Sequence, residues 1–171
     1  ILIEAAMIAR NIAPGLNRQF ASEEWTNIDK KYWEKAREDA HKAIKTEGAL
    51  NILGFDIDPE RIKDCFKNTK KAGVEKDINF TAKDIKDLRI DKQYGVIISN
   101  PPYGVTMGTL KQLTKLYVLI HNMFRKKIGW AIYILTADKR FPDFFKRSDP
   151  DRVRKLVRGK RSWELGIRSW E

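Results

Sequence analysis

Short apolar runs alternate with helical stripes along most of the chain. We predict that the apolar runs are strands, which cover 52–55, 77–82, 94–99 and 129–136. In other segments apolar residues recur every three or four positions, the spacing of one buried helix face. The helices predicted from this spacing cover 1–12, 29–46, 58–73 and 110–127. Since parallel strands need long crossovers, this order predicts an α/β doubly wound fold, a mainly parallel sheet with helices on both faces.

Polar residues follow three of the predicted strands, where ligands bind in doubly wound folds. They are Asp56, Asp84 and Asn100. A lone Asp after a strand more often begins a turn or caps a helix. Here Asp58 and Pro59 already suit the start of the next helix, which leaves Asp56 to accept the two hydroxyls of a ribose. Asp84 either accepts the amine of an adenine ring or begins the next turn.

The run Asn100-Pro101-Pro102-Tyr103 is more specific. The two prolines remove two backbone donors, so local carbonyl oxygens face outward without amide competitors. Asn100 adds a side-chain oxygen and Tyr103 a flat ring, which together can hold a planar base and accept both hydrogens of its exocyclic amine. Such hydrogen bonds favour a pyramidal nitrogen whose lone pair points at an electrophile. This predicts alkylation of an exocyclic amine; the alternative is a proline-rich turn followed by a packing tyrosine.

These residues resemble the S-adenosylmethionine-dependent methyltransferases of the Rossmann-like class I that carry an Asn-Pro-Pro-Tyr motif. The segments ILGFDIDP (52–59) and NPPYG (100–104) stand in the family's order, with Asp84 between them. NIAPGLNRQFASEEW (11–25) and GWAIYILT (129–136) resemble the RNA methylases with an upstream THUMP domain, which include ribosomal-RNA guanine-N2 methyltransferases.

The resemblance implies S-adenosylmethionine as the cofactor. Asp56 would bind its ribose, Ile57 would pack on its adenine, and Asp84 would contact the adenine amine. Asn100 borders both the cofactor and the target. The expected cofactor-binding residues are therefore Asp56, Ile57, Asp84 and Asn100.

The resemblance also implies direct methyl transfer to an exocyclic amine of an RNA base, with guanine N2 of ribosomal RNA as the first candidate. Asn100 and the Pro101 carbonyl would orient the amine, and Tyr103 would stack on the base. Together with Pro102 these are the candidate catalytic residues. Two alternatives stay open: a DNA adenine-N6 methyltransferase, and a non-catalytic RNA-binding remnant that lost its cofactor loop.

The chain begins at Ile1 inside a predicted helix, without an initiator Met or a helix cap. We interpret it as an N-terminally truncated piece, in which the family's glycine-rich turn and central first strand are missing. We divide it into a truncated methyltransferase catalytic domain, 1–147, and a basic C-terminal segment, 148–171. We expect the second part to be irregular, because RSWELGIRSWE (161–171) repeats RSWE without the alternation of a strand.

Charge favours a polyanionic partner. There are 34 lysines and arginines against 23 aspartates and glutamates, which gives a net charge of +11. The densest basic patch consists of Arg152, Arg154, Lys155, Arg158, Lys160 and Arg161. It is either a solvated face or a surface that contacts phosphates; with the other basic groups it favours RNA over a protein substrate.

Several classes of protein are excluded by the remaining composition. The single cysteine, Cys65, cannot form an intramolecular disulfide, and no Cys/His cluster has the spacing of a metal site. No apolar run approaches the ~18 residues that a membrane span needs, and no secretory signal is visible. We therefore expect a cytoplasmic protein without a metal or a membrane partner.

Overall fold

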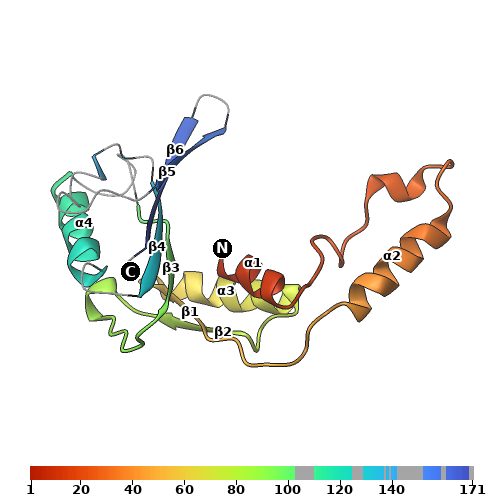
Figure 1. The fold of residues 1–171 in the computed structure, drawn as a ribbon, viewed down its shortest axis with the longest axis horizontal. Helices are drawn as coiled ribbons and strands as arrows, with labels where there is room; N and C mark the ends of the chain where they lie inside the picture. The colour runs from red at the N-terminus through yellow and green to blue at the C-terminus, as the bar shows by residue number, and fades with distance from the viewer. Residues whose placement is uncertain are drawn as a thin grey trace. The chain divides into compact units, whose positions relative to one another are not determined.

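The computed structural model describes residues 1–102, 110–124, 129–136, 138, 140–141, 152–158 and 161–169. Their contacts group into two units, residues 1–84 and 85–171. Each unit combines helices with a small sheet, and Figure 1 labels the elements of both. Among the described residues, no helix has both the length and the apolar character that crossing a membrane requires.

The first unit is built on a pair of parallel strands. Its elements are α1 (Leu2–Ala9), the 3-10 helix η1 (Ala21–Glu24), α2 (Lys30–Lys42), β1 (Ile52–Asp56), α3 (Pro59–Ala72) and β2 (Ile78–Ala82). In the pairing, Ile52 lies opposite Ile78 and Asp56 opposite Ala82. α1 and α3 pack against each other and against both strands, and Ala6, Val74 and Ile78 form the buried core. The predicted helices and strands of this part are confirmed.

Local capping explains the bounds of α3. The Asp58 side chain accepts a hydrogen bond from the Glu60 backbone amide, 2.9 Å away, and Pro59 occupies the first turn. At the other end Gly73 has a φ of 70°, the left-handed conformation that glycine adopts without strain. These are the signals from which the helix over 58–73 was predicted.

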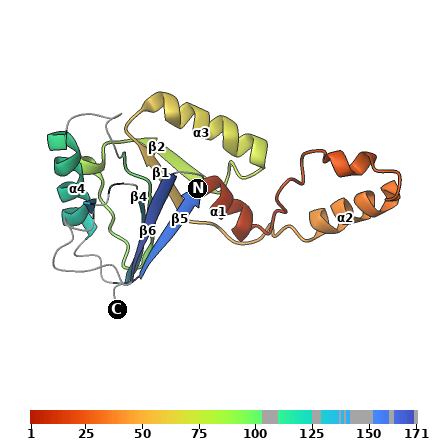
Figure 2. The ribbon, with the colours of Figure 1, turned by 90° about the horizontal axis from the view of Figure 1, so that it is seen from above.

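We call residues 13–47 the α2 arm, because α2 lies apart from the β1–β2 pair in both views (Figure 1 and Figure 2). No residue of α2 is buried. The arm is held by its own contacts: the Phe20 and Trp33 rings stack with centroids 6.0 Å apart. The Arg37 guanidinium donates to the Leu16 carbonyl at 2.7 Å and pairs with Glu23 at 2.5 Å. The arm is therefore a small folded lobe of its own.

Arg10, at the end of α1, joins the base of this arm to the sheet. Its guanidinium donates to the Glu47 and Gly48 carbonyls, both at 2.9 Å, and pairs with Asp77 just before β2 at 2.5 Å. The side chains of Arg10 and Asp77 are only 14% and 9% exposed. Hydrogen bonding to Asp77 raises the pKa of Arg10. One side chain thus connects α1, the segment before β1 and the start of β2.

We expect Arg10→Met to lower the melting temperature by several degrees, because it leaves the nearly buried Asp77 carboxylate without its cation. The matched control is Lys35→Met, which removes an exposed ion pair with Asp39 on α2 and should leave stability almost unchanged. Thermal unfolding followed by circular dichroism measures both variants. If Arg10→Met melts at the same temperature as Lys35→Met, the ion pair between Arg10 and Asp77 does not contribute to stability.

The second unit contains a four-stranded sheet in the order β3-β4-β6-β5. Its elements are the 3-10 helix η2 (Ile85–Asp87), β3 (Gly95–Ser99), α4 (Leu110–Phe124), β4 (Trp130–Thr136), β5 (Arg152–Arg158) and β6 (Arg161–Ser169). β3 and β4 are parallel, whereas β6 is antiparallel to both β4 and β5. Leu113, Tyr117 and Ile120 of α4 pack with Ile132 and Ile134 of β4 in its core.

The expected irregular segment at 148–171 is wrong where the structure describes it, because β5 and β6 form a hairpin there. The alternation typical of a strand is present in the sequence: Trp163, Leu165 and Ile167 occupy every second position. The repeat of RSWE at 161–164 and 168–171 obscured the two-residue period of these apolar positions. Pairing with neighbouring strands also stabilises β6: Ile167 lies opposite Tyr133 of β4, and Glu164 lies opposite Lys155 of β5.

Each sheet also has an open edge among the described strands. β1 pairs only with β2, and β3 only with β4 at one end of the larger sheet. One face of both edge strands is apolar and exposed: Leu53 and Phe55 are 54% and 40% exposed, and Val96 and Ile98 are 61% and 41% exposed.

Candidate functional site

The first group of candidate residues lies where β1 ends. Asp56 is the last residue of β1, and its Oδ1 accepts a hydrogen bond from the Asp58 backbone amide, 2.9 Å away. Within the described residues its second carboxylate oxygen has no hydrogen-bond partner. Ile57 beside it is 70% exposed. Asp56 therefore shapes the turn into α3 and also offers an exposed acceptor, so the two interpretations of this residue are compatible.

Asp84 is brought to the same edge by the pairing of β1 and β2. The Lys83 backbone amide donates to the Asp56 carbonyl at 2.7 Å, which joins the two carboxyl ends. Asp84 follows directly and is half-buried. The structure therefore places Asp56, Ile57 and Asp84 together at the carboxyl end of the β1–β2 pair. Their roles in cofactor binding stay a prediction.

The second group lies where β3 ends, in the second unit. Asn100 follows Ser99 and is exposed, Pro101 is buried, and Pro102 is half-buried. Tyr103, the last member of the motif, lies outside the described residues. In the segment Asn100–Pro102 the Asn100 side-chain amide is thus exposed, while the buried Pro101 ring fixes the segment to the protein.

One buried polar side chain that sequence analysis did not single out, Tyr117, contacts this segment, and a second, Asp138, contacts Tyr117. Tyr117 of α4 is 1% exposed, and its hydroxyl lies 3.3 Å from the Pro102 carbonyl oxygen and 3.3 Å from Asp138 Oδ2. Burial and the negative charge of Asp138 raise the pKa of Tyr117 to about 12. Asp138 had a detectable signal, since it follows the fourth predicted strand. Tyr117 had none beyond its place in an apolar stripe.

Arg140 completes this cluster. Its Nε and Nη2 donate to the two Asp138 carboxylate oxygens at 2.8 and 2.6 Å. These hydrogen bonds hold the pKa of Asp138 below its usual range. The Asp138 carboxylate therefore stays ionised at neutral pH and is held by Arg140 on one side and approached by Tyr117 on the other.

The donors and acceptors at these strand ends suit particular ligands. An exposed carboxylate oxygen beside an exposed isoleucine fits a sugar diol linked to a flat apolar ring. The Asn100 amide oxygen fits an N–H donor. Among the described residues, no group of three His, Cys, Asp or Glu side chains is placed to hold a metal ion.

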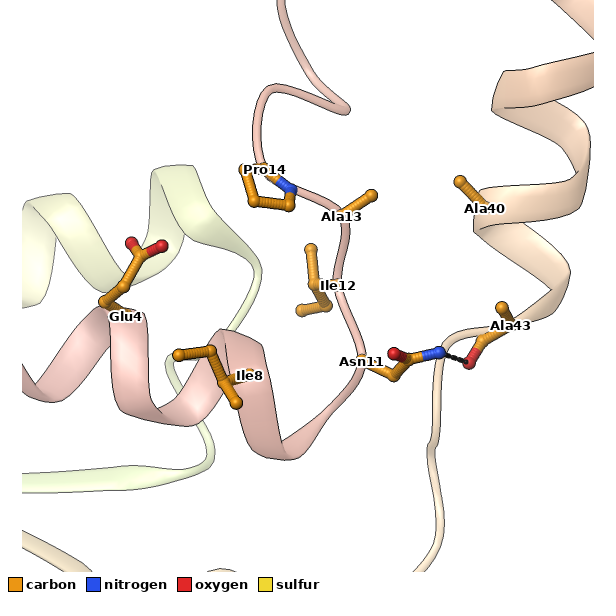
Figure 3. A pocket seen from close by; sticks show the side chains of 8 residues that line it. All are labelled: Glu4, Ile8, Asn11, Ile12, Ala13, Pro14, Ala40 and Ala43. Carbon is orange, nitrogen blue, oxygen red and sulfur yellow. Dashed lines mark hydrogen bonds between the residues drawn. The ribbon is translucent and has the colours of Figure 1, made fainter.

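A hollow of about 290 Å³ lies elsewhere in the first unit. Figure 3 shows it between α1, the linker after α1 and the end of α2, where the Asn11 side chain donates to the Ala43 carbonyl at 3.0 Å. Its walls consist of Glu4, Ile8, Asn11, Ile12, Ala13, Pro14, Ala40 and Ala43. No predicted site residue lines it, so this hollow is separate from the candidate site.

The predicted basic patch falls on the hairpin of the second unit. Arg152, Arg154, Lys155 and Arg158 belong to β5, the edge strand of the sheet, and Arg161 begins β6. Lys160 lies outside the described residues. Arg158, the last residue of β5, lies opposite Arg161, the first residue of β6. The patch is thus concentrated on one sheet edge rather than on an irregular tail.

Comparison with known proteins identifies relatives over nearly the whole chain. The family profile described as "RMKL-like, methyltransferase domain" matches residues 1–166. YpsC of Bacillus subtilis, provisionally named as an RNA methyltransferase, is 36% identical over 159 residues, which are 93% of this chain and 41% of YpsC. Ribosomal RNA large subunit methyltransferase K/L of Shewanella frigidimarina is 37% identical over 143 residues, 81% of this chain and 20% of that protein. The chain spans less than half the length of these curated relatives.

Solved structures of named methyltransferases have the same fold as this chain. SMU.472, provisionally named as a methyltransferase and solved with SAH, has a TM-score of 0.93 at 35% identity, covering 99% of this chain and 45% of its own. A protein of Listeria monocytogenes provisionally named as an N6-adenine-specific DNA methylase has a TM-score of 0.89 at 32% identity, covering 99% of this chain and 43% of its own. This chain therefore has the fold of these proteins.

Proposed function

The chain belongs to the family of RMKL-like methyltransferase domains, and on that premise we propose that it takes part in S-adenosylmethionine-dependent methyl transfer to an exocyclic amine of an RNA base. Guanine N2 of ribosomal RNA is the first candidate. The predicted Rossmann-like, class I fold is confirmed by the solved methyltransferases. The observation that carries the proposal is the segment Asn100–Pro102 at the carboxyl end of β3, with its amide exposed.

Residues at the end of β1 fit the adenosine part of the cofactor. The Asp56 carboxylate oxygen that has no partner among the described residues can accept hydrogen bonds from the ribose hydroxyls, and the exposed Ile57 side chain can cover the adenine ring. Asp84, at the same edge, is the acceptor assigned to the adenine amine. When bound, the cofactor supplies a methyl group activated by a sulfonium. The protein's part is to hold that group in place and to keep water away from it.

The exocyclic amine needs activation, because its lone pair is delocalised into the base. We assign its two hydrogens to the Asn100 side-chain oxygen and the Pro101 carbonyl, and the stacking of its base to Tyr103. Accepting both hydrogens favours a pyramidal nitrogen and aims its lone pair. No ionised general base or metal is needed for this step, because the amine attacks in its neutral form and gives up its extra proton to solvent after the methyl group has been transferred.

RNA as the substrate is supported by three observations. Relatives named as RNA or ribosomal-RNA methyltransferases match this chain at 36–37% identity. The segment 11–25 resembles the RNA methylases, and the basic residues of β5 lie on a sheet edge where they can meet phosphates. We further propose that the complete protein is cytoplasmic and carries a THUMP-type RNA-binding domain.

A panel of methyl acceptors tests the proposal. The complete polypeptide is incubated with methyl-labelled S-adenosylmethionine and with ribosomal RNA, transfer RNA or duplex DNA, and the labelled nucleoside is identified by mass spectrometry. We expect label in N2-methylguanosine of ribosomal RNA. Label in N6-methyladenine of DNA would favour the rival suggested by the Listeria homologue's name. RNA binding without transfer to any acceptor would favour the non-catalytic remnant.

A further inference from the structure

The Tyr117 hydroxyl can donate a hydrogen bond to the proline segment, Asn100–Pro102. It is 3.3 Å from the Pro102 carbonyl oxygen, on a side chain that is 1% exposed. We propose that Tyr117 is a positioning residue for methyl transfer, which acts by fixing the Pro102 carbonyl and, with it, the orientation of Asn100. This inference rests on the proposed function of the Asn100–Pro102 segment.

The segment needs such a contact because its own backbone provides few. Each proline ring fixes φ but leaves ψ free, so rotation about the Cα–C bond can swing the carbonyl that follows. The two prolines also lack the N–H groups that would tie the segment to a neighbouring strand. Pro101 is buried and anchors one point. A donor on the Pro102 carbonyl anchors a second point and restricts rotation about the Pro102 Cα–C bond.

Tyr117 is itself held rigidly. Its ring meets Phe141 edge to face, with centroids 4.8 Å apart and an angle of 81° between the planes. Its hydroxyl also lies 3.3 Å from Asp138 Oδ2, and Arg140 fixes that carboxylate through two hydrogen bonds. The hydroxyl therefore lies within reach of two acceptors from different parts of the unit, Pro102 of the proline segment and Asp138 after β4, and its single proton bonds one of them at a time.

The chemistry of the hydroxyl suits a permanent donor. Because burial and Asp138 raise the pKa of Tyr117 to about 12, it keeps its proton throughout the physiological range. A purely structural tyrosine would need only its ring, which already fills the space between α4 and Phe141. The two roles therefore separate in Tyr117→Phe, which keeps the ring and removes the donor. Asp138 remains paired with Arg140 in that variant, so no buried charge loses its partner.

The test compares Tyr117→Phe with Tyr133→Phe in the complete polypeptide. Tyr133 is a half-buried residue of β4 that lies opposite Ile167 of β6. We expect Tyr117→Phe to lower kcat by roughly tenfold, the effect of one lost hydrogen bond, with unchanged affinity for the cofactor and an unchanged melting temperature. Tyr133→Phe should behave as wild type. Wild-type kcat in Tyr117→Phe, or a fall in kcat matched by a fall in melting temperature, would overturn the proposal.

A second measurement separates this inference from the proposed function. The ¹⁵N side-chain amide signal of Asn100, assigned with Asn100→Ala, reports the orientation of the segment without turnover. In the wild type we expect a single ¹⁵N shift for the Asn100 side-chain amide, seen as its pair of N–H cross-peaks. In Tyr117→Phe we expect this pair to be shifted or split. If the wild type transfers methyl to no acceptor, the proposed function fails while this comparison still decides the role of Tyr117. An identical Asn100 signal in both proteins would show that Tyr117 does not position it.

Discussion

Asn100→Ala is expected to reduce kcat for methyl transfer by about 10²-fold or more, while the affinity for S-adenosylmethionine changes little. The reason is that the side-chain oxygen is assigned to the amine that reacts, and its hydrogen bond strengthens as the nitrogen becomes pyramidal. An interaction that is made mainly in the transition state lowers kcat when it is lost. Single-turnover kinetics with labelled cofactor and calorimetric binding measure the two quantities separately.

Two further variants sharpen this result. Asn122 lies exposed on α4, and Asn122→Ala is the matched control that should keep the wild-type rate. Asn100→Asp keeps an oxygen acceptor at the site and should retain more activity than Asn100→Ala. An Asn100→Ala protein with an undiminished rate would remove Asn100 from the chemistry altogether.

Asp56→Ala is expected to weaken cofactor binding by roughly 10- to 100-fold, the range for hydrogen bonds that involve a charged group. The ribose hydroxyls would lose a carboxylate acceptor at the end of β1. Because Asp56 also accepts the Asp58 amide, part of the loss will come from a looser turn before α3. Calorimetric titration of the complete polypeptide with S-adenosylhomocysteine gives the dissociation constant.

Asp56→Asn separates these two contributions, since its amide oxygen can keep the bond to the Asp58 amide while the charge is gone. Asp64→Ala is the control, because Asp64 lies exposed on α3 in an ion pair with Lys67. We expect the order of affinities to be Asp64→Ala, then Asp56→Asn, then Asp56→Ala. Equal affinities in all three would exclude Asp56 from the cofactor site.

Most of the regular structure was predictable because its signals are local. The cap at Asp58 and the glycine at 73 act within one helical turn, and α3 begins and ends where they indicate. The helix predicted over 1–12 ends earlier, at Ala9, and Asn11 then takes a positive φ of 56°. The turn before Pro14 therefore shortens the helix more than the apolar pattern suggested.

The hairpin of β5 and β6 shows where local signals mislead. Its alternating apolar positions are readable in 163–167, but the nearby repeat obscured them. A strand is stabilised by its neighbours, and β6 gains partners on both sides, β4 and β5. The first of these pairings joins residues up to 38 positions apart, as in Ala131 and Ser169. Such partners are not visible in a short sequence window.

The sequence by itself determined the order of the α-helices and strands up to β4, the bounds of α3, and the residues that follow each of these strands, because period and capping depend on near neighbours. Only the tertiary structure showed that Arg10 reaches Asp77 and that Tyr117 reaches Pro102 and Asp138. A periodic pattern predicts which positions are buried, but it does not predict which polar atoms form hydrogen bonds or ion pairs with each other. That choice follows from how the chain brings distant segments together, and the proposed role of Tyr117 depends on it.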